Sequence, residues 1–310
     1  MRESQKYLDP VALSRLGGME LVARLVVEGF ITGLHKSPYQ GFSVEFAEHR
    51  QYMPGDDIRH IDWKVFGKSD RFYVKKFEEE TNLRAYILLD ASGSMGYKSD
   101  GLSKLEYGCY LAASLTYLML KQRDSVGLVV FDTQMRRYIP PRGEPTHLNS
   151  ITSVLEETKA GDETSISRTF NELAKQIVRR GLIIIISDLL DKPHDVLTSL
   201  KHFRHRKHEV IVFHLLDKAE LTFPFNGPIV FRDMENNRLL STQAEALKAE
   251  YLQQISNLIQ DYRRGCGANS IDYVQIDTST PFDYALFSYL SRRKRKAEGG
   301  RRKAEGERRK

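Results

Sequence analysis

The sequence lacks several features that mark common classes of protein. It contains two cysteines, Cys109 and Cys266, which are too few for a disulfide framework and are not spaced as metal ligands. No stretch approaches the roughly 18 consecutive apolar residues of a membrane-spanning helix, and the most apolar run, Leu182–Ile186, has the length of a strand. No glycine-rich phosphate loop with a lysine is present, so we do not expect the chain to hydrolyse ATP. These absences predict a cytoplasmic protein of a reducing compartment.

The excess of basic charge is concentrated at one end of the chain. The 310 residues include 47 Lys or Arg and 41 Asp or Glu, a formal net charge of +6. Segment 292–310 contains eleven basic and three acidic residues, a net of +8, which leaves 36 basic and 38 acidic residues, a net of −2, in 1–291. The composition therefore does not indicate a nucleic-acid-binding face on the folded body. We interpret the tail as a solvated low-complexity extension, with binding to nucleic acid or an anionic surface as the alternative.

Apolar strands alternate with amphipathic helices from residue 85 onwards. The expected strands are 85–90, 125–131, 135–139, 181–188, 210–216 and 271–276. The expected helices are 103–122, 146–158, 167–180, 194–205, 243–263 and one that begins at 282. Short apolar strands separated by helices are typical of a parallel sheet covered on both faces. The predicted fold class is therefore α/β, a doubly wound, mostly parallel sheet, in which strand 135–139 is the hairpin partner of the strand before it.

Composition and pattern divide the chain into four segments. Residues 1–39 are expected to be an N-terminal helical segment and 40–84 a β-containing subdomain. Residues 85–291 are expected to form the sheet domain, with a β-hairpin inserted near 221–242, and 292–310 is the basic tail.

Three oxygen-bearing side chains follow the first strand of the sheet domain. Asp90 ends the strand, and Ser92 and Ser94 follow at alternate positions, with Gly93 allowing the loop to turn tightly. The carboxyl ends of parallel strands form the ligand-binding edge of an open α/β sheet. Carboxylate and hydroxyl oxygens are ligands that suit Mg²⁺ or Mn²⁺. The alternative is a polar connection between strand and helix in which a serine acts only as a helix cap.

Two further oxygens are expected at the same edge of the sheet. Asp188 ends a second strand, and Thr164 lies in the loop before helix 167–180. Asp132, after a third strand, is placed to orient such a site. The positions that compete with Thr164 are Ser165, Ser167 and Thr169.

An Asp-x-Ser-x-Ser loop with a distant Thr and a strand-end Asp resembles the metal-ion-dependent adhesion site of von Willebrand factor type A domains. The resemblance implies that Ser92, Ser94 and Thr164 contact the cation, and that Asp90 and Asp188 act weakly or through water. In that family the carboxylate of a partner protein completes the coordination. The resemblance therefore implies a cation that bridges two proteins, and we expect no enzyme. A Lys or Arg head group in the open position would exclude this account.

A second resemblance covers residues 40–290. The run from Tyr52 to Trp63 reads Tyr-x-Pro-Gly-Asp-Asp-x-Arg-x-Ile-Asp-Trp. It is similar to the signature of the bacterial domain of unknown function 58 family, whose genes commonly stand beside MoxR-type AAA+ ATPases. The resemblance implies an adaptor or partner of such an ATPase in assembling or activating another complex. Many members carry N-terminal membrane helices, so this sequence is expected to fall in a soluble subgroup.

The charged residues of that signature have two interpretations. They form a structural clamp between the segments, which we favour, or they form a docking surface. The docking candidates are Arg50, Asp56, Asp57, Arg59, Asp62 and Trp63.

Two weaker patterns remain. Ser94 lies on a strand-to-helix turn and, with Asp188 and His214, would form a serine-hydrolase triad, but the first Gly of the G-x-S-x-G motif is missing. His214 lies in an apolar strand and is interpreted as a core histidine with satisfied hydrogen bonds. The run Lys201–His208 is interpreted as the solvated basic end of a helix rather than as a metal or nucleic-acid site.

Overall fold

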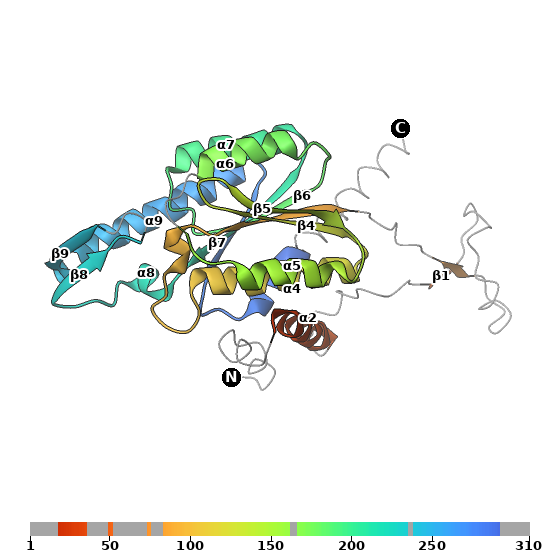
Figure 1. Cartoon of the computed structure of the whole chain (residues 1–310), viewed down its shortest axis with the longest axis horizontal. Coiled ribbons are helices and arrows are strands. Elements are labelled where there is room, and N and C mark those ends of the chain that lie inside the picture. Colours follow the sequence, from red (N-terminus) through yellow and green to blue (C-terminus); the bar gives the residue numbers. More distant parts are fainter. Residues whose placement is uncertain are drawn as a thin grey trace. The chain divides into compact units, whose positions relative to one another are not determined.

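The computed structural model describes residues 18–35, 49–51, 73–75, 83–161, 166–234 and 238–291 (Figure 1). The chain divides into two units, of which Thr32–Asn82 is the smaller. In that smaller unit β1 (His49–Gln51) pairs antiparallel with β2 (Tyr73–Lys75).

Six strands form the central sheet of the larger unit, in the order β10-β7-β6-β3-β4-β5. Their bounds are β3 (Arg84–Asp90), β4 (Ser125–Phe131), β5 (Met135–Arg142), β6 (Leu182–Ser187), β7 (Glu209–Leu216) and β10 (Asp272–Asp277). All neighbours are parallel except β5, which pairs antiparallel with β4. The predicted α/β class and the predicted hairpin partner of β4 are both confirmed. Because the chain first builds outward from β3 on one side and then on the other, the end of β3 is the switch point at which such sheets bind ligands.

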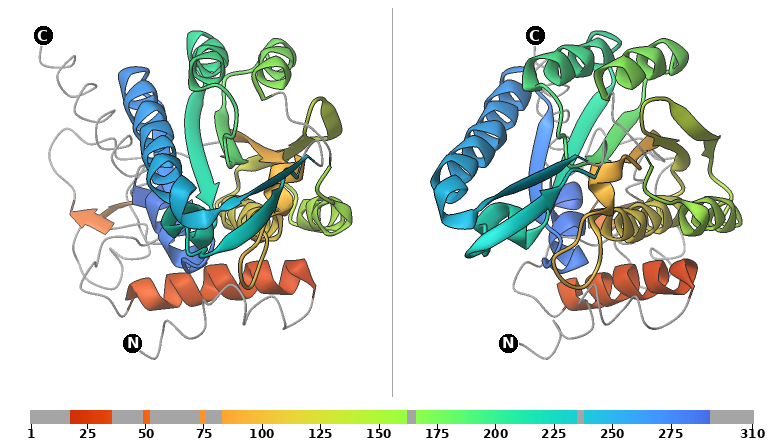
Figure 2. Two further views of the ribbon diagram at one scale, coloured as in Figure 1. Left: turned by 90° about the vertical axis from the view of Figure 1, so that its left-hand side faces the viewer. Right: turned by 60° about the vertical axis from the view of Figure 1, so that its left-hand side comes forward.

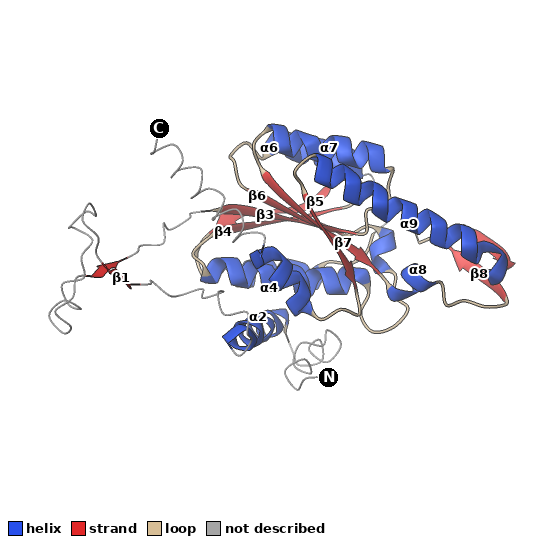
Figure 3. Cartoon of the chain, turned by 180° about the vertical axis from the view of Figure 1, so that it is seen from behind, coloured by secondary structure: helices blue, strands red, loops and turns tan. Residues whose placement is uncertain are grey.

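Helices cover both faces of this sheet (Figures 1 and 3). The helices against the sheet are α4 (Lys104–Lys121), α5 (His147–Glu157), α6 (Ile166–Gln176), α7 (Pro193–His205) and α9 (Ala244–Ala268). Helices α4 and α5 lie on one face, and α6, α7 and α9 lie on the other (Figures 1 and 3).

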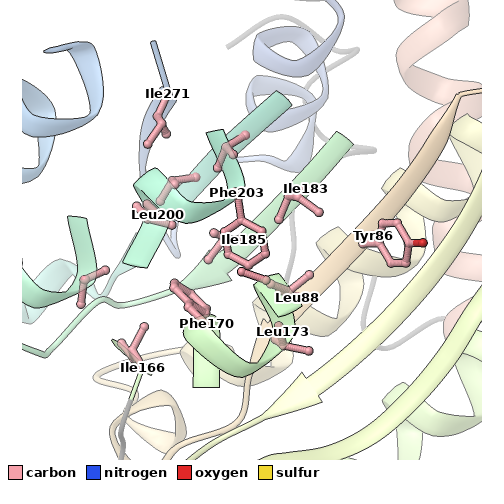
Figure 4. Packing of buried hydrophobic residues seen from close by; sticks show 14 of the residues in the cluster. Tyr86, Leu88, Ile166, Phe170, Leu173, Ile183, Ile185, Leu200, Phe203 and Ile271 are labelled. Atoms are coloured by element: carbon pink, nitrogen blue, oxygen red, sulfur yellow. The ribbon is translucent and has the colours of Figure 1, made fainter. Parts of the chain in front are cut away.

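Successive side chains of β3 pack against opposite faces of the sheet. Leu88 lies in a buried cluster with Phe170 of α6 and Phe203 of α7 (Figure 4). Leu89 points the other way, where a Cβ added to Gly108 of α4 would lie only 3.0 Å from its Cδ1 atom. The strand is therefore buried on both faces, which explains its continuous apolar sequence.

A capping box fixes the start of α4 at the edge of the sheet. The Ser103 hydroxyl accepts the N–H of Glu106 at 3.1 Å, and the Glu106 carboxylate accepts the N–H of Ser103 at 2.7 Å. Both orphan N–H groups are thereby satisfied, so the helix begins at Lys104 and not elsewhere.

Helix α6 ends at Gln176, earlier than the predicted residue 180, because a buried histidine forms hydrogen bonds with the backbone that follows the helix. The Nε2 atom of His208 donates to the Ile177 carbonyl at 3.1 Å, and its Nδ1 atom accepts the N–H of Gly181 at 3.2 Å. The interpretation of His208 as part of a solvated helix end is therefore wrong, whereas His202 and His205 are exposed.

An insertion lies between β7 and α9 (Figure 2). It contains the short helix α8 (Lys218–Thr222) and the antiparallel strands β8 (Pro228–Arg232) and β9 (Leu239–Gln243). Aromatic contacts hold it against α9, since the centre of the Phe223 ring lies 5.0 Å from that of Tyr251, with the ring planes tilted by 43°.

Helix α2 (Met19–His35) belongs to the larger unit as far as Ile31 and buries Val22 and Val26 completely. Its Glu28 carboxylate accepts the hydroxyl of Tyr117 at 2.9 Å. Within the ranges that the structure describes, no helix combines the length and the hydrophobicity needed to cross a membrane.

Candidate functional site

The edge beyond the carboxyl ends of the parallel strands, here called the crest, is built around Asp90. This carboxylate is fully buried at the end of β3. Its Oδ1 atom accepts the N–H of Ser92 at 2.9 Å, and its Oδ2 atom accepts the hydroxyl of Ser187 at 2.6 Å. Ser187 in turn accepts the N–H of Leu189 at 2.9 Å. Asp90 therefore ties together the loops that follow β3 and β6.

The hydroxyls of Ser92 and Ser94 converge at the crest, as the motif predicts. Their Oγ atoms lie 3.2 Å apart, and both side chains are buried. The loop continues into a short 3-10 helix, Gly93–Gly96, but the Ser92 side chain makes no capping hydrogen bond to it. Ser92 thus stands at the N-cap position without acting as a cap through its hydroxyl.

Two other loops meet the crest at Gly93. A Cβ added to Gly93 would lie 2.7 Å from the Met234 carbonyl oxygen and 2.9 Å from that of Gly161. Gly161 also donates its N–H to the Ala91 carbonyl at 2.8 Å. The loop that leads to Thr164 thus reaches the crest, while Thr164 and Ser165 themselves lie outside the described residues.

One of the hydroxyl candidates that compete with Thr164 has another partner. Thr169 is buried and donates to the Asp132 carbonyl at 3.2 Å. The Asp132 carboxylate is held by Arg136, which also donates to the Lys159 carbonyl at 2.8 Å. Arg136 thus links Asp132 to the loop at 159–161, and the role of Asp132 in orienting a cation site stays a prediction.

Asp188 lies at the crest but is engaged by a cation of the chain itself. The Nζ atom of Lys104 donates to Asp188 Oδ2 at 2.8 Å and to Glu220 Oε1 at 2.6 Å. Lys104 and Asp188 are buried, and the Glu220 side chain is 13% exposed. An ammonium group therefore occupies one oxygen of a predicted cation ligand. Among the described residues, the Lys104 ammonium donates hydrogen bonds to these two carboxylates and not to the serine hydroxyls.

The buried carboxyl groups of the crest repel one another, and further positive charge would stabilise their ionised forms. Burial, and then the charge of Asp188, raise the pKa of Asp90 to about 7. Burial also raises the pKa of Glu220. Burial would lower the pKa of Lys104, but the two adjacent carboxylates outweigh it and raise that pKa. Two carboxylates, those of Asp188 and Glu220, thus contact one buried ammonium, and the charge of Asp188 acts on the nearby Asp90.

These groups fit a divalent cation through their oxygen chemistry. Hydroxyl and carboxylate oxygens are hard ligands that Mg²⁺ and Mn²⁺ accept. Within the described part of the chain, no group of three or more His, Cys, Asp or Glu side chains is arranged to hold a metal ion. A cation at the crest would therefore depend on the hydroxyls of Ser92 and Ser94.

The serine-hydrolase triad is not assembled. Because a carbonyl can only accept, His214 Nε2 donates to the Asp188 backbone oxygen at 2.7 Å, and Nδ1 accepts the Tyr273 hydroxyl at 2.6 Å. Both ring nitrogens of His214 are thus used away from Ser94, and burial lowers its pKa to about 4. The prediction of a core histidine with satisfied hydrogen bonds is confirmed, and the triad is wrong.

A cavity of about 250 Å³ leads to the crest from the surface. It is lined by Ser94, Tyr97, Leu190, Glu220, Asp233 and Met234. Leu190 is 39% exposed and Met234 is 45% exposed, so its rim offers apolar surface to a partner. The inserted hairpin supplies one wall through Met234.

The predicted docking residues lie in the smaller unit. Arg50 belongs to β1, of which only the backbone is described. The other five, namely Asp56, Asp57, Arg59, Asp62 and Trp63, lie outside the described residues, as does the basic tail 292–310.

Comparison with known proteins identifies relatives of this chain. The family model described as "Protein of unknown function DUF58" matches residues 48–258. The uncharacterized protein Rv1480 of Mycobacterium tuberculosis is 25% identical over 267 residues, which cover 84% of both chains. Among solved structures, the conserved hypothetical protein BatB from Bacteroides thetaiotaomicron is 18% identical, with a TM-score of 0.47, over 68% of this chain and 98% of that one. The SpRpn10 VWA domain is 10% identical, with a TM-score of 0.38, over 66% and 93% of the two chains.

Proposed function

The chain belongs to the DUF58 family, and from that premise we propose that it is a cation-dependent protein-interaction module. Its larger unit has the von Willebrand factor type A-like architecture, a mostly parallel sheet with one antiparallel edge strand and helices on both faces. The crest of that sheet binds Mg²⁺ or Mn²⁺ and receives a carboxylate from a partner protein.

One observation carries the proposal, namely the excess of buried carboxylates beside two adjacent hydroxyls. Asp90 and Asp188 are buried close enough to raise the pKa of Asp90, although Lys104 neutralises one charge. Buried charges are tolerated in proteins when they are paired or coordinate metals. A divalent ion would offset the charge of these carboxylates, and the Ser92 and Ser94 oxygens, 3.2 Å apart, would serve as its ligands.

The residues of the chain have distinct tasks in this proposal. Ser92 and Ser94 hold the cation, with Thr164 as the predicted third hydroxyl, and Asp90 holds the Ser92 backbone in place. When bound, the cation supplies an electrophilic centre for an incoming carboxylate. Neutral hydroxyl ligands preserve that charge better than direct carboxylate ligands do. No enzymatic activity is proposed.

The approach to Ser94 offers apolar contacts to residues that flank the partner's carboxylate. The cavity beside Ser94 has an exposed apolar rim at Leu190 and Met234. Exposed apolar rims beside a polar centre are typical of protein-binding sites. From the family resemblance we propose a MoxR-type AAA+ ATPase, or its client, as the partner.

Calorimetric titration with Mg²⁺ and Mn²⁺ tests the cation site. We expect one ion per wild-type chain and an affinity about 10- to 100-fold lower in Ser92→Ala and Ser94→Ala. Ser153→Ala is the matched control, because its exposed hydroxyl bonds only within its own helix. Equal binding by wild type and both crest variants would remove the proposal.

A pull-down of the ATPase with and without EDTA tests the partner. We expect retention that requires free Mg²⁺ and is lost in Ser94→Ala. Retention that is indifferent to the chelator would show that the partner binds elsewhere.

A further inference from the structure

Lys104 occupies a position where a cation is doubly disfavoured. It is the first residue of α4, where the helix dipole opposes positive charge, and it is fully buried. A lysine ordinarily extends its ammonium group to water. Its placement is therefore explained only by what the ammonium contacts.

Those contacts join three elements at the crest. Lys104 Nζ reaches Asp188 after β6 and Glu220 on α8, at 2.8 and 2.6 Å. It also lies 5.9 Å from the centre of the Tyr97 ring. Glu220 is itself fixed, because its second oxygen accepts the N–H of Asp217 at 2.7 Å. The ammonium is thus held from two sides and cannot swing away without breaking buried hydrogen bonds.

We infer that Lys104 is a resident cation that holds Asp188 back from the divalent ion and so keeps one coordination position for the partner's carboxylate. This inference rests on the proposed function. The ammonium group and a metal ion would compete for Asp188 Oδ2, because both need the same carboxylate oxygen. The crest therefore binds its divalent ion more weakly than it would if Lys104 were absent. The coordination of the ion is completed only when the partner's carboxylate binds.

A second consequence concerns the chain without metal. Lys104 neutralises Asp188 at all times, so the crest remains folded when no divalent ion is bound. Loading and release of the ion are then reversible events on a preformed site rather than steps of folding.

The test compares the Mg²⁺ affinity of three variants with that of the wild type. Lys104→Met keeps the length of the side chain and removes its charge. Lys104→Met with Glu220→Gln removes one positive and one negative charge, so the net charge of the crest is unchanged. Lys121→Met, an exposed position at the other end of the same helix, is the control.

We expect Lys104→Met to lower the Tm without metal, to bind Mg²⁺ about tenfold more tightly, and to gain more Tm at saturating Mg²⁺ than the wild type does. The double variant should also bind about tenfold more tightly, because Asp188 is freed. Lys121→Met should match the wild type. Unchanged affinity in a folded double variant would overturn the inference, since Lys104 would then act through net charge alone.

A measurement on the wild-type protein covers the case in which both variants fail to fold. The ¹⁵N resonance of the Lys104 ammonium should stay protected from solvent at saturating Mg²⁺. Its loss on Mg²⁺ binding would mean that the ion displaces the ammonium, which contradicts the inference. A wild-type chain that binds no Mg²⁺ would instead remove the proposed function, and this inference with it.

Discussion

Replacing the buried carboxylate at the crest with an amide should stabilise the protein at neutral and alkaline pH. Asp90 has a pKa of about 7 in the folded chain against 3.8 for the unperturbed group. Between these values the folded state retains a proton that the unfolded state has lost, so the free energy of unfolding falls as pH rises. At 1.36 kcal/mol for each pKa unit, the ionised carboxylate destabilises the fold by about 4 kcal/mol above pH 7.

The variant Asp90→Asn removes this charge and keeps the shape. One hydrogen bond is weakened because the amide nitrogen now faces Ser187, at a loss of about 1 kcal/mol. We therefore expect Asp90→Asn to be more stable than the wild type by about 3 kcal/mol at pH 8 in EDTA, and not more stable at pH 4.

Urea unfolding at both pH values, with and without Mg²⁺, measures the effect. Magnesium should stabilise the wild type at pH 8 more than it stabilises Asp90→Asn, because the variant lacks the negative charge beside the ion, so that the difference between them shrinks. A variant less stable than the wild type at pH 8 in EDTA would refute the reasoning, because the buried carboxylate would then be stabilising without a metal ion.

Three further predictions concern neighbouring residues. Gly93→Ala places a Cβ less than 3 Å from two backbone carbonyl oxygens, so we expect a loss of about 1–3 kcal/mol in urea unfolding and a loss of Mg²⁺ binding by calorimetry. In an Asp90→Asn background, the free energy of unfolding should fall by about 3 kcal/mol from pH 6.5 to pH 4, because His214 is held neutral in the fold and is protonated on unfolding. Adding His214→Gln should remove most of that fall, and a slope that persists would assign it to another group. Leu190→Asp should leave the Tm unchanged and reduce retention of the partner about tenfold or more in the pull-down, whereas unchanged retention would place the interface elsewhere.

The order of elements and the centre of the site were predictable because they depend on local sequence. The strand ending in Asp90 has a run of buried residues from Ala85 to Leu89, and Ser92 and Ser94 follow it within four residues, so one loop brings the three oxygens together. The hairpin of β4 and β5 was predictable for the same reason, since the two strands are adjacent in the chain.

The features that sequence reasoning missed depend on contacts between distant residues. Lys104 meets Asp188 and Glu220 across separations of 84 and 116 residues, and no local pattern reports such a pair. The one available signal was a lysine at the first position of a capped helix, where positive charge is unfavourable. His208 was misinterpreted because its flanking basic residues are exposed, while its own ring is buried between α6 and β6.

The most direct test of the central claim is electron paramagnetic resonance of Mn²⁺ titrated into the full chain. The account predicts that the free-ion signal is suppressed up to one Mn²⁺ per chain, that Mg²⁺ restores the signal by competition, and that Ser92→Ala with Ser94→Ala abolishes the suppression. A free-ion signal that rises from the first addition in the wild type, or a suppression that survives in the double serine variant, would contradict it.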